Sequence, residues 1–234
     1  MKFIGVRILS PEPAETAARL SEKLQLPCET AGDDYVVGAP GCEIRFTKGD
    51  IAAPQEAQEG YYVGLQHLAF NSTDLPASVK LCLEHGTELT NGEAISYNPK
   101  IWGTGMNYVN PVCPDGYGLE ICQRLDLPAA PMRGMTCGME HIGIPVRNLE
   151  ESIAWYEKLG FKAGSVVLNH RDSDNADIHC AMLEGDGVIL ETYEFQHMDH
   201  EPFANQPFHA LRFAGEKDEV LTGPNGEIIE VTAA

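Results

Sequence analysis

The chain has 234 residues, of which 43% are hydrophobic and 22% are charged, as in an ordinary globular protein with a buried core. Its formal net charge of −19 argues against nucleic acid or an anionic membrane as a partner, and no stretch approaches the ~20 apolar residues of a membrane helix. We expect a cytoplasmic protein, because the start runs straight into an apolar segment, and its 7 cysteines, without a Cys-x-x-Cys pair, are expected to be free thiols.

Residues 1–49 form the first of four predicted modules. The pattern predicts a strand at Phe3–Leu9, a helix at Glu12–Leu24 and further strands near Tyr35–Val37 and Glu43–Thr47.

The second module, residues 61–124, opens with the apolar segment Leu65–Phe70, which has His67 at its middle. A polar turn and a helix are expected next. The module closes with a Pro-Asp-Gly turn at 114–116 that leads into a strand with Glu120 at its centre.

A linker rich in proline and glycine, residues 125–137, precedes the third module, residues 138–196. The strand Met139–Ile144 contains His141, and the amphipathic helix Leu149–Leu159 has Asn148 as its N-cap. A later strand carries Glu191, with Glu194 as the alternative carboxylate, because a shift of one residue reverses the face of a strand.

The fourth module, residues 207–232, is a shortened copy. It begins with the strand Phe208–Phe213, which contains His209, and ends with a Pro-Asn-Gly turn before a strand that contains Glu230. The interval between them is too short for a helix.

The recurrence of one histidine and one glutamate in matching strands predicts a metal site. A lone histidine or glutamate in a strand is usually structural or solvated, but a buried carboxylate is costly unless it is paired or binds a metal. Two imidazoles with two carboxylates suit a divalent ion such as Zn²⁺, Ni²⁺, Fe²⁺ or Mn²⁺. The candidate ligands are His67, Glu120, His141, Glu191, His209 and Glu230.

The segments Glu140–Ile144 and Leu149–Phe161, together with the closing hairpin around Glu120, resemble the vicinal-oxygen-chelate superfamily of glyoxalases, bleomycin-resistance proteins and extradiol dioxygenases. The resemblance implies an α+β fold of tandem βαβββ modules that form cupped mixed sheets. It also implies that one ion, held by paired modules, chelates vicinal oxygens of a small substrate. Glu191 and Glu230 are then the candidate catalytic carboxylates.

Two pairings of the modules are open. Pairing in chain order, favoured by the linker, gives domains 1–124 and 138–234 and assembles His141, Glu191, His209 and Glu230 in the second. Pairing of the second module with the third instead assembles His67, Glu120, His141 and Glu191. The first module has Phe3 at one ligand place and Arg45, or Glu43 in the other register, at the second, so we expect no metal there.

Three classes of function are open. The first is a metal-dependent enzyme, for which lyase or isomerase chemistry is favoured over ring cleavage. The second is a metal-free protein of the bleomycin-resistance type that binds a small molecule, and the third is a protein that only reuses the fold. The expected partner is a small molecule, and either a monomer or a homodimer is compatible with the pattern.

Overall fold

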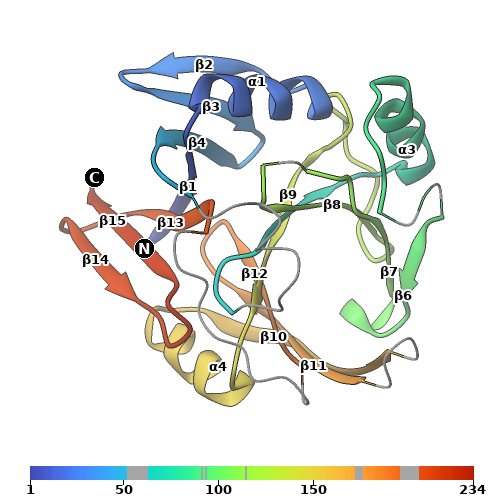
Figure 1. The fold of residues 1–234 in the computed structure, drawn as a ribbon. Helices are drawn as coiled ribbons and strands as arrows, with labels where there is room; N and C mark the ends of the chain where they lie inside the picture. The colour runs from blue at the N-terminus through green and yellow to red at the C-terminus, as the bar shows by residue number, and fades with distance from the viewer. Residues whose placement is uncertain (52–62, 91, 93, 114, 172–175, 196–205) are drawn as a thin grey trace.

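The computed structural model describes residues 1–51, 63–90, 92, 94–113, 115–171, 176–195 and 206–234, without the side chains of 170, 171 and 176. Pro114, the first residue of the predicted Pro-Asp-Gly turn, lies outside these residues. The described chain folds into two mixed β-sheets with a helix in each of the first three modules (Figure 1). The predicted α+β fold of cupped mixed sheets is confirmed.

The larger sheet combines the second and third modules. It has eight strands in the order β10-β11-β12-β9-β5-β8-β7-β6, and the two modules join where β5 pairs antiparallel with β9. In Figure 1 this sheet curls from β10 and β11 round to β6 and β7. Its strands are β5 His67–Asn71, β6 Ser96–Asn98, β7 Met106–Val109, β8 Gly118–Arg124, β9 Gly138–Pro145, β10 Lys162–Arg171, β11 Ala176–Glu184 and β12 Ile189–Phe195.

The smaller sheet combines the first and fourth modules. It has seven strands in the order β14-β15-β13-β1-β4-β3-β2, with β1 antiparallel to β13 at the join. Its strands are β1 Lys2–Ser10, β2 Cys28–Ala31, β3 Asp34–Ala39, β4 Cys42–Lys48, β13 Phe208–Gly215, β14 Glu219–Thr222 and β15 Ile228–Ala233.

The pairing of modules in chain order is therefore wrong. Residues 125–137, interpreted from their composition as a linker between paired units, connect two modules of the same sheet. The amide of Cys137 donates to the carbonyl of Asn71 over 2.8 Å, which ties the end of this segment to β5. A proline- and glycine-rich segment marks a break in regular structure, but it does not decide which strands pair across it.

The helices follow the predicted pattern closely. Helix α1 spans Pro13–Leu24, α3 spans Leu75–Glu84 and α4 spans Leu149–Lys158, and a 3₁₀ turn, η1, covers Ile101–Gly103. Asn148 is the N-cap of α4 as predicted, since its Oδ1 accepts from the Glu151 amide over 2.9 Å. Residues 206–234 contain no helix, in agreement with a shortened fourth module.

The two sheets share one hydrophobic core. Phe3 of β1 and Phe161 of the third module both contact the Phe213 ring edge-to-face, with centroids 5.5 and 6.2 Å away. A second, smaller apolar cluster, which includes Ala69, Met106 and Met182, lies in the larger sheet. None of the described helices is long and apolar enough to span a membrane.

Candidate functional site

Two histidines and two glutamates from four neighbouring strands of the larger sheet meet in a group that we term the His–Glu cluster: His67 of β5, Glu120 of β8, His141 of β9 and Glu191 of β12. The two imidazole Nε2 atoms are 3.2 Å apart. Glu191 Oε2 lies 3.5 Å from Nε2 of His67 and 3.3 Å from Nε2 of His141. Glu120 Oε1 lies 3.7 Å from His141 Nε2. All four side chains are largely shielded from solvent, with side-chain exposures of 15% or less.

Backbone register explains why these side chains converge. In the parallel pair β5–β8, Ala69 is opposite Glu120, and in the parallel pair β9–β12, Gly143 is opposite Glu191. Each histidine lies two residues before that small partner, on the same face of its strand. Gly143 also faces His67 across the join, and a Cβ there would lie 1.8 Å from the imidazole carbon Cε1. A glycine at this position is what lets the imidazole of His67 cross over β9.

The carboxylate of Glu140 contacts the Nδ1 side of His141, away from the cluster. Pairing between β5 and β9 shifts register between Ala69 and Phe70, which leaves Glu140 as the extra residue of a β-bulge. Its Oε2 makes a short hydrogen bond to His141 Nδ1, while Oε1 lies 3.5 Å from Nη1 of Arg124. The guanidinium of Arg124 stacks 3.8 Å above the Trp102 ring. With Nδ1 of His141 engaged by Glu140, the orientation of the ring is fixed and Nε2 faces the cluster.

His67 has a neutral support instead. Its Nδ1 lies 3.3 Å from Gln66 Oε1, which also accepts a short hydrogen bond from the Tyr193 hydroxyl. Gln66 and Glu140 were not among the predicted site residues, although the sequence contains a signal for both. In each opening strand the residue just before the histidine has a side chain that can accept a hydrogen bond.

Burial and the charges of neighbouring groups shift the pKa values of the four cluster side chains in different directions. Burial and the nearby His141 lower the pKa of His67 to about 4, and burial raises the pKa of Glu120 to about 8. Burial opposes the charge of His141, but Glu140 and Glu191 outweigh it and raise its pKa. Burial also opposes ionisation of Glu191, but His141 lowers its pKa to about 2. At neutral pH the metal-free cluster thus contains an ion pair of His141 and Glu191 beside a neutral His67 and a protonated Glu120.

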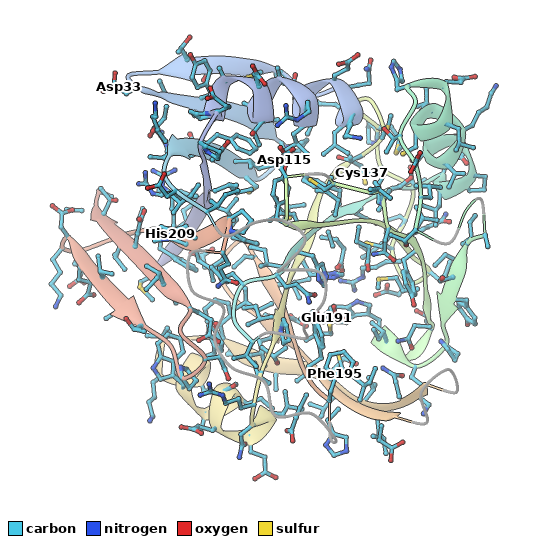
Figure 2. All side chains as sticks on the ribbon, viewed as in Figure 1. Asp33, Asp115, Cys137, Glu191, Phe195 and His209 are labelled. Carbon is cyan, nitrogen blue, oxygen red and sulfur yellow. The ribbon has the colours of Figure 1, made fainter. Side chains whose placement is uncertain are left out.

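The other two predicted ligands lie elsewhere. His209 is on β13 of the smaller sheet, where Figure 2 shows it well apart from Glu191. Glu230, on the neighbouring strand β15, accepts hydrogen bonds from Nε and Nη2 of Arg7 at 2.9–3.0 Å. The prediction that His209 and Glu230 complete a set with His141 and Glu191 is therefore wrong.

One residue of register accounts for the error at His209. Pairing of β1 with β13 shifts so that Arg7 is opposite Ala210 and Ile8 opposite Phe208, leaving His209 as the extra residue of a bulge. Its counterpart in the third module is Glu140, the bulge residue of β9, and the counterpart of His141 is Ala210. Glu194, the alternative to Glu191, has a different role, because its Oε2 accepts from the Leu149 amide over 2.8 Å at the start of α4.

A cavity of about 330 Å³ adjoins the His–Glu cluster, and Glu120 and Glu191 form part of its wall. Figure 2 shows Glu191 and Phe195 within the space that the curled sheet surrounds. The rest of the described lining is mainly aromatic, aliphatic and amide side chains from both ends of the sheet, including Tyr97, Ile101, Tyr108, Ile178, Tyr193 and Phe195. A cavity of this size fits a small organic molecule.

Comparisons with known proteins agree with this architecture. Residues 138–220 match the model of the Glyoxalase/Bleomycin resistance protein/Dioxygenase superfamily. The structure is similar to glyoxalase I from Zea mays, with a TM-score of 0.67 at 14% identity over 99% of this chain and 92% of that one. It is also similar to a putative dioxygenase from Bacillus subtilis subsp. subtilis str. 168, with a TM-score of 0.62 at 13% identity over 100% of this chain and 85% of that one. No curated protein matches the chain by sequence.

Proposed function

We propose that this chain, a member of the vicinal-oxygen-chelate superfamily, binds one divalent transition-metal ion at the His–Glu cluster and acts on a small molecule with vicinal oxygen atoms. The observation that carries the proposal is the meeting of His67 Nε2, His141 Nε2 and Glu191 Oε2 within 3.5 Å of one another, with Glu120 Oε1 at 3.7 Å from His141.

The electrostatics of the cluster fit a bound cation. Among the described residues, neither Glu120 nor Glu191 has a lysine or arginine within ion-pair distance. Oxygen Oε1 of Glu120 is buried and has no hydrogen-bond partner in the part of the chain that the structure describes. Buried carboxylates without a cation are costly, and a buried acceptor without a donor is uncommon in native proteins. A divalent ion would satisfy both carboxylates at once.

The donor set also suits the ion. Two imidazole nitrogens and two carboxylate oxygens are the ligands that Zn²⁺, Ni²⁺, Fe²⁺ and Mn²⁺ accept, and the outer contacts to Glu140 and Gln66 are of the kind that orient metal-bound histidines. When bound, such an ion polarises the oxygens of the substrate and stabilises negative charge that develops on them.

Of the two carboxylates, Glu120 is the better candidate for the base that moves a proton. Both line the cavity, but Glu191 already interacts with two histidines and with the Cys180 thiol. Among the described residues Glu120 has one oxygen, Oε1, without a hydrogen-bond partner, so this carboxylate has the free acceptor. In its ionised form it can take a proton from the hydroxyl-bearing carbon of an α-hydroxycarbonyl and return it to the neighbouring carbonyl carbon, while the hydroxyl proton passes to the former carbonyl oxygen, which is an isomerisation. The resemblance to the superfamily instead implied Glu191 and Glu230 for this role.

Metal analysis of the full chain tests the proposal. Protein purified without chelator and without a metal-affinity tag is expected to contain, or take up, about one transition-metal ion per chain. The variant His141→Ala is expected to lose it, while His209→Ala, in the other sheet, keeps it. Failure of the wild type to take up Zn²⁺, Ni²⁺, Fe²⁺ or Mn²⁺ contradicts the proposal.

The alternative function is metal-free binding of a small molecule, as in bleomycin-resistance proteins. The cavity of about 330 Å³ supports it, because its described lining supplies aromatic and apolar contact area that requires no ion. A protein that takes up no metal yet binds a small aromatic molecule in this cavity would have that function.

A further inference from the structure

The cavity beside the His–Glu cluster has an unusual charge distribution. Glu120 and Glu191 are acidic, and among the described residues that line it there is no lysine or arginine. The whole chain has a net charge of −19, so the surrounding field is also negative. A negative group on a ligand that lies away from the bound ion would find no lysine or arginine among the described residues of this lining.

The described cations closest in sequence to the lining are engaged elsewhere. Arg124 forms ion pairs with Asp126 and Glu140 and stacks on the Trp102 ring. Lys100 donates from Nζ to the backbone carbonyl of Leu168 over 2.5 Å. Neither side chain is among those that line the cavity, so a remote carboxylate or phosphate on a ligand would lose water there without compensation from a described lysine or arginine.

Aromatic and branched aliphatic groups form the walls instead. Tyr97 and Tyr108 come from β6 and β7 at one end of the larger sheet, while Tyr193 and Phe195 come from β12. Ile178 of β11 adds an apolar surface. Rings on two sides suit a flat apolar ligand, because stacked and edge-to-face contacts add to the burial of its surface.

Resting on the function proposed above, we propose that the substrate is uncharged apart from its vicinal oxygens and carries an apolar group about the size of one aromatic ring. The oxygens face Glu120 and Glu191 at the bound ion, and the ring lies between the tyrosines. A substrate with a further carboxylate or phosphate is rejected. The selection comes from the cost of burying an unpaired anion beside two acids.

Two probes with the same chelating group test this selection. Benzohydroxamate and its 4-carboxy derivative each present two adjacent oxygens, and they differ by one remote carboxylate. Both are titrated into the Ni²⁺-loaded full chain at constant ionic strength. We expect the carboxylated probe to bind at least tenfold more weakly, which corresponds to about 1.4 kcal/mol.

A substitution at the solvent edge of the cavity sharpens the test. Tyr97 is 54% exposed, so Tyr97→Lys should fold and place a cation in the lining. It is expected to restore most of the affinity for the carboxylated probe, whereas the uncharged control Tyr97→Met should leave the ratio of the two affinities unchanged.

The outcomes separate the two proposals. Equal or tighter binding of the carboxylated probe to the metal-loaded protein overturns the substrate class and leaves the metal site intact. Failure of both probes to bind the loaded protein also overturns the substrate class. A chain that takes up no metal ion before any probe is added overturns the function on which the inference rests.

Discussion

The two sheets have the same backbone arrangement but carry different side chains at the matching positions. In the larger sheet each opening strand supplies a histidine, followed two residues later by a small residue that is opposite a glutamate of the closing strand. In the smaller sheet the histidine positions hold small residues, with Gly5 rather than the predicted Phe3 in the first module, and arginines follow two residues later. Each module thus has three matching positions: the histidine position, the residue two later, and the closing-strand residue opposite it. In the larger sheet these are His67, Ala69 and Glu120 in the second module, and His141, Gly143 and Glu191 in the third. In the smaller sheet they are Gly5, Arg7 and Arg45 in the first module, and Ala210, Arg212 and Glu230 in the fourth.

The guanidinium groups of the smaller sheet find their partners within the chain. Arg7 is bound by Glu230 and Thr47 at 2.9 Å, and Arg45 by Asp34 at 3.1 Å. Arg212 lies 3.4 Å from Glu43 and 3.9 Å from Glu230. We term these residues the Arg–acid network: Arg7, Asp34, Glu43, Arg45, Arg212 and Glu230.

The comparison shows how one frame yields two roles. Three arginines and three acids of the Arg–acid network balance each other, so that sheet needs no external ion. The His–Glu cluster contains two carboxylates and no lysine or arginine within ion-pair distance among the described residues, so its charge is balanced only by protons or by a bound cation.

The largest contrast is expected from removing one imidazole in each sheet. His141→Gln should reduce bound metal below one-tenth of an ion per chain, because it removes a nitrogen that lies within 3.7 Å of three other cluster groups. His209→Gln should keep the wild-type content. Metal content by mass spectrometry after dialysis measures both, with circular dichroism as the check on folding. Loss of metal in the His209 variant, with metal retained in the His141 variant, would place the metal site in the smaller sheet and contradict the account.

The pH dependence of metal binding should be steep in the range 6 to 8. A metal-bound cluster needs unprotonated His141 and Glu120, whose pKa values are raised, the second to about 8. His67 and Glu191, with pKa values of about 4 and 2, have already lost their protons. Affinity should therefore rise at least tenfold per pH unit as pH increases through this range.

Calorimetry in buffers of different ionisation enthalpy counts the protons released. More than one proton per ion is expected at pH 7. If no proton is released, His141 and Glu120 are already deprotonated in the metal-free protein at pH 7, which contradicts the raised pKa values on which the prediction rests.

A smaller effect is expected from the support of His141. Glu140→Gln keeps the size of the side chain but removes the charge that faces Nδ1, and should weaken metal binding about 10- to 100-fold. Glu230→Gln is the matched change in the other sheet and should not alter metal affinity. Competition with a chromophoric chelator measures both. Equal affinities for wild type and Glu140→Gln would leave the bulge without a functional role.

The smallest effect is expected from the Arg–acid network. Glu230→Gln weakens the paired hydrogen bonds with Arg7, whose side chain is 24% exposed. We expect about 1 kcal/mol of lost stability, because partial exposure to solvent reduces the strength of a charged hydrogen bond. Urea unfolding of the metal-free protein measures it. A gain in stability would show that the network is strained.

Much of the fold follows from the sequence, because each module repeats one hydrophobic pattern with recognisable turns. The predicted helix at Glu12–Leu24 is observed at Pro13–Leu24, and Asn148 caps α4 as expected. The pairing of modules could not be derived, since it depends on contacts between distant strands, such as Lys2 with Ala214. Local patterns carry no signal for these contacts.

Four of the six candidate ligands come together, and the other two lie in the smaller sheet, where Glu230 binds Arg7. His209 and Glu230 fit the pattern of histidine and glutamate, but one bulge residue moves His209 out of the ligand position. Bulges depend on the partner strand and leave little trace in composition. The supports Gln66 and Glu140 were overlooked because neighbours in a regular strand point to opposite faces.

A crystal of the full chain grown with Co²⁺ or Ni²⁺, with diffraction collected on both sides of the metal absorption edge, gives the most direct test. One anomalous peak is expected in contact with Nε2 of His67 and Nε2 of His141, with Glu120 and Glu191 coordinating beside it. A protein crystal with no peak there, or with its strongest peak among Arg7, Arg45 and Glu230, would contradict the metal-centred function.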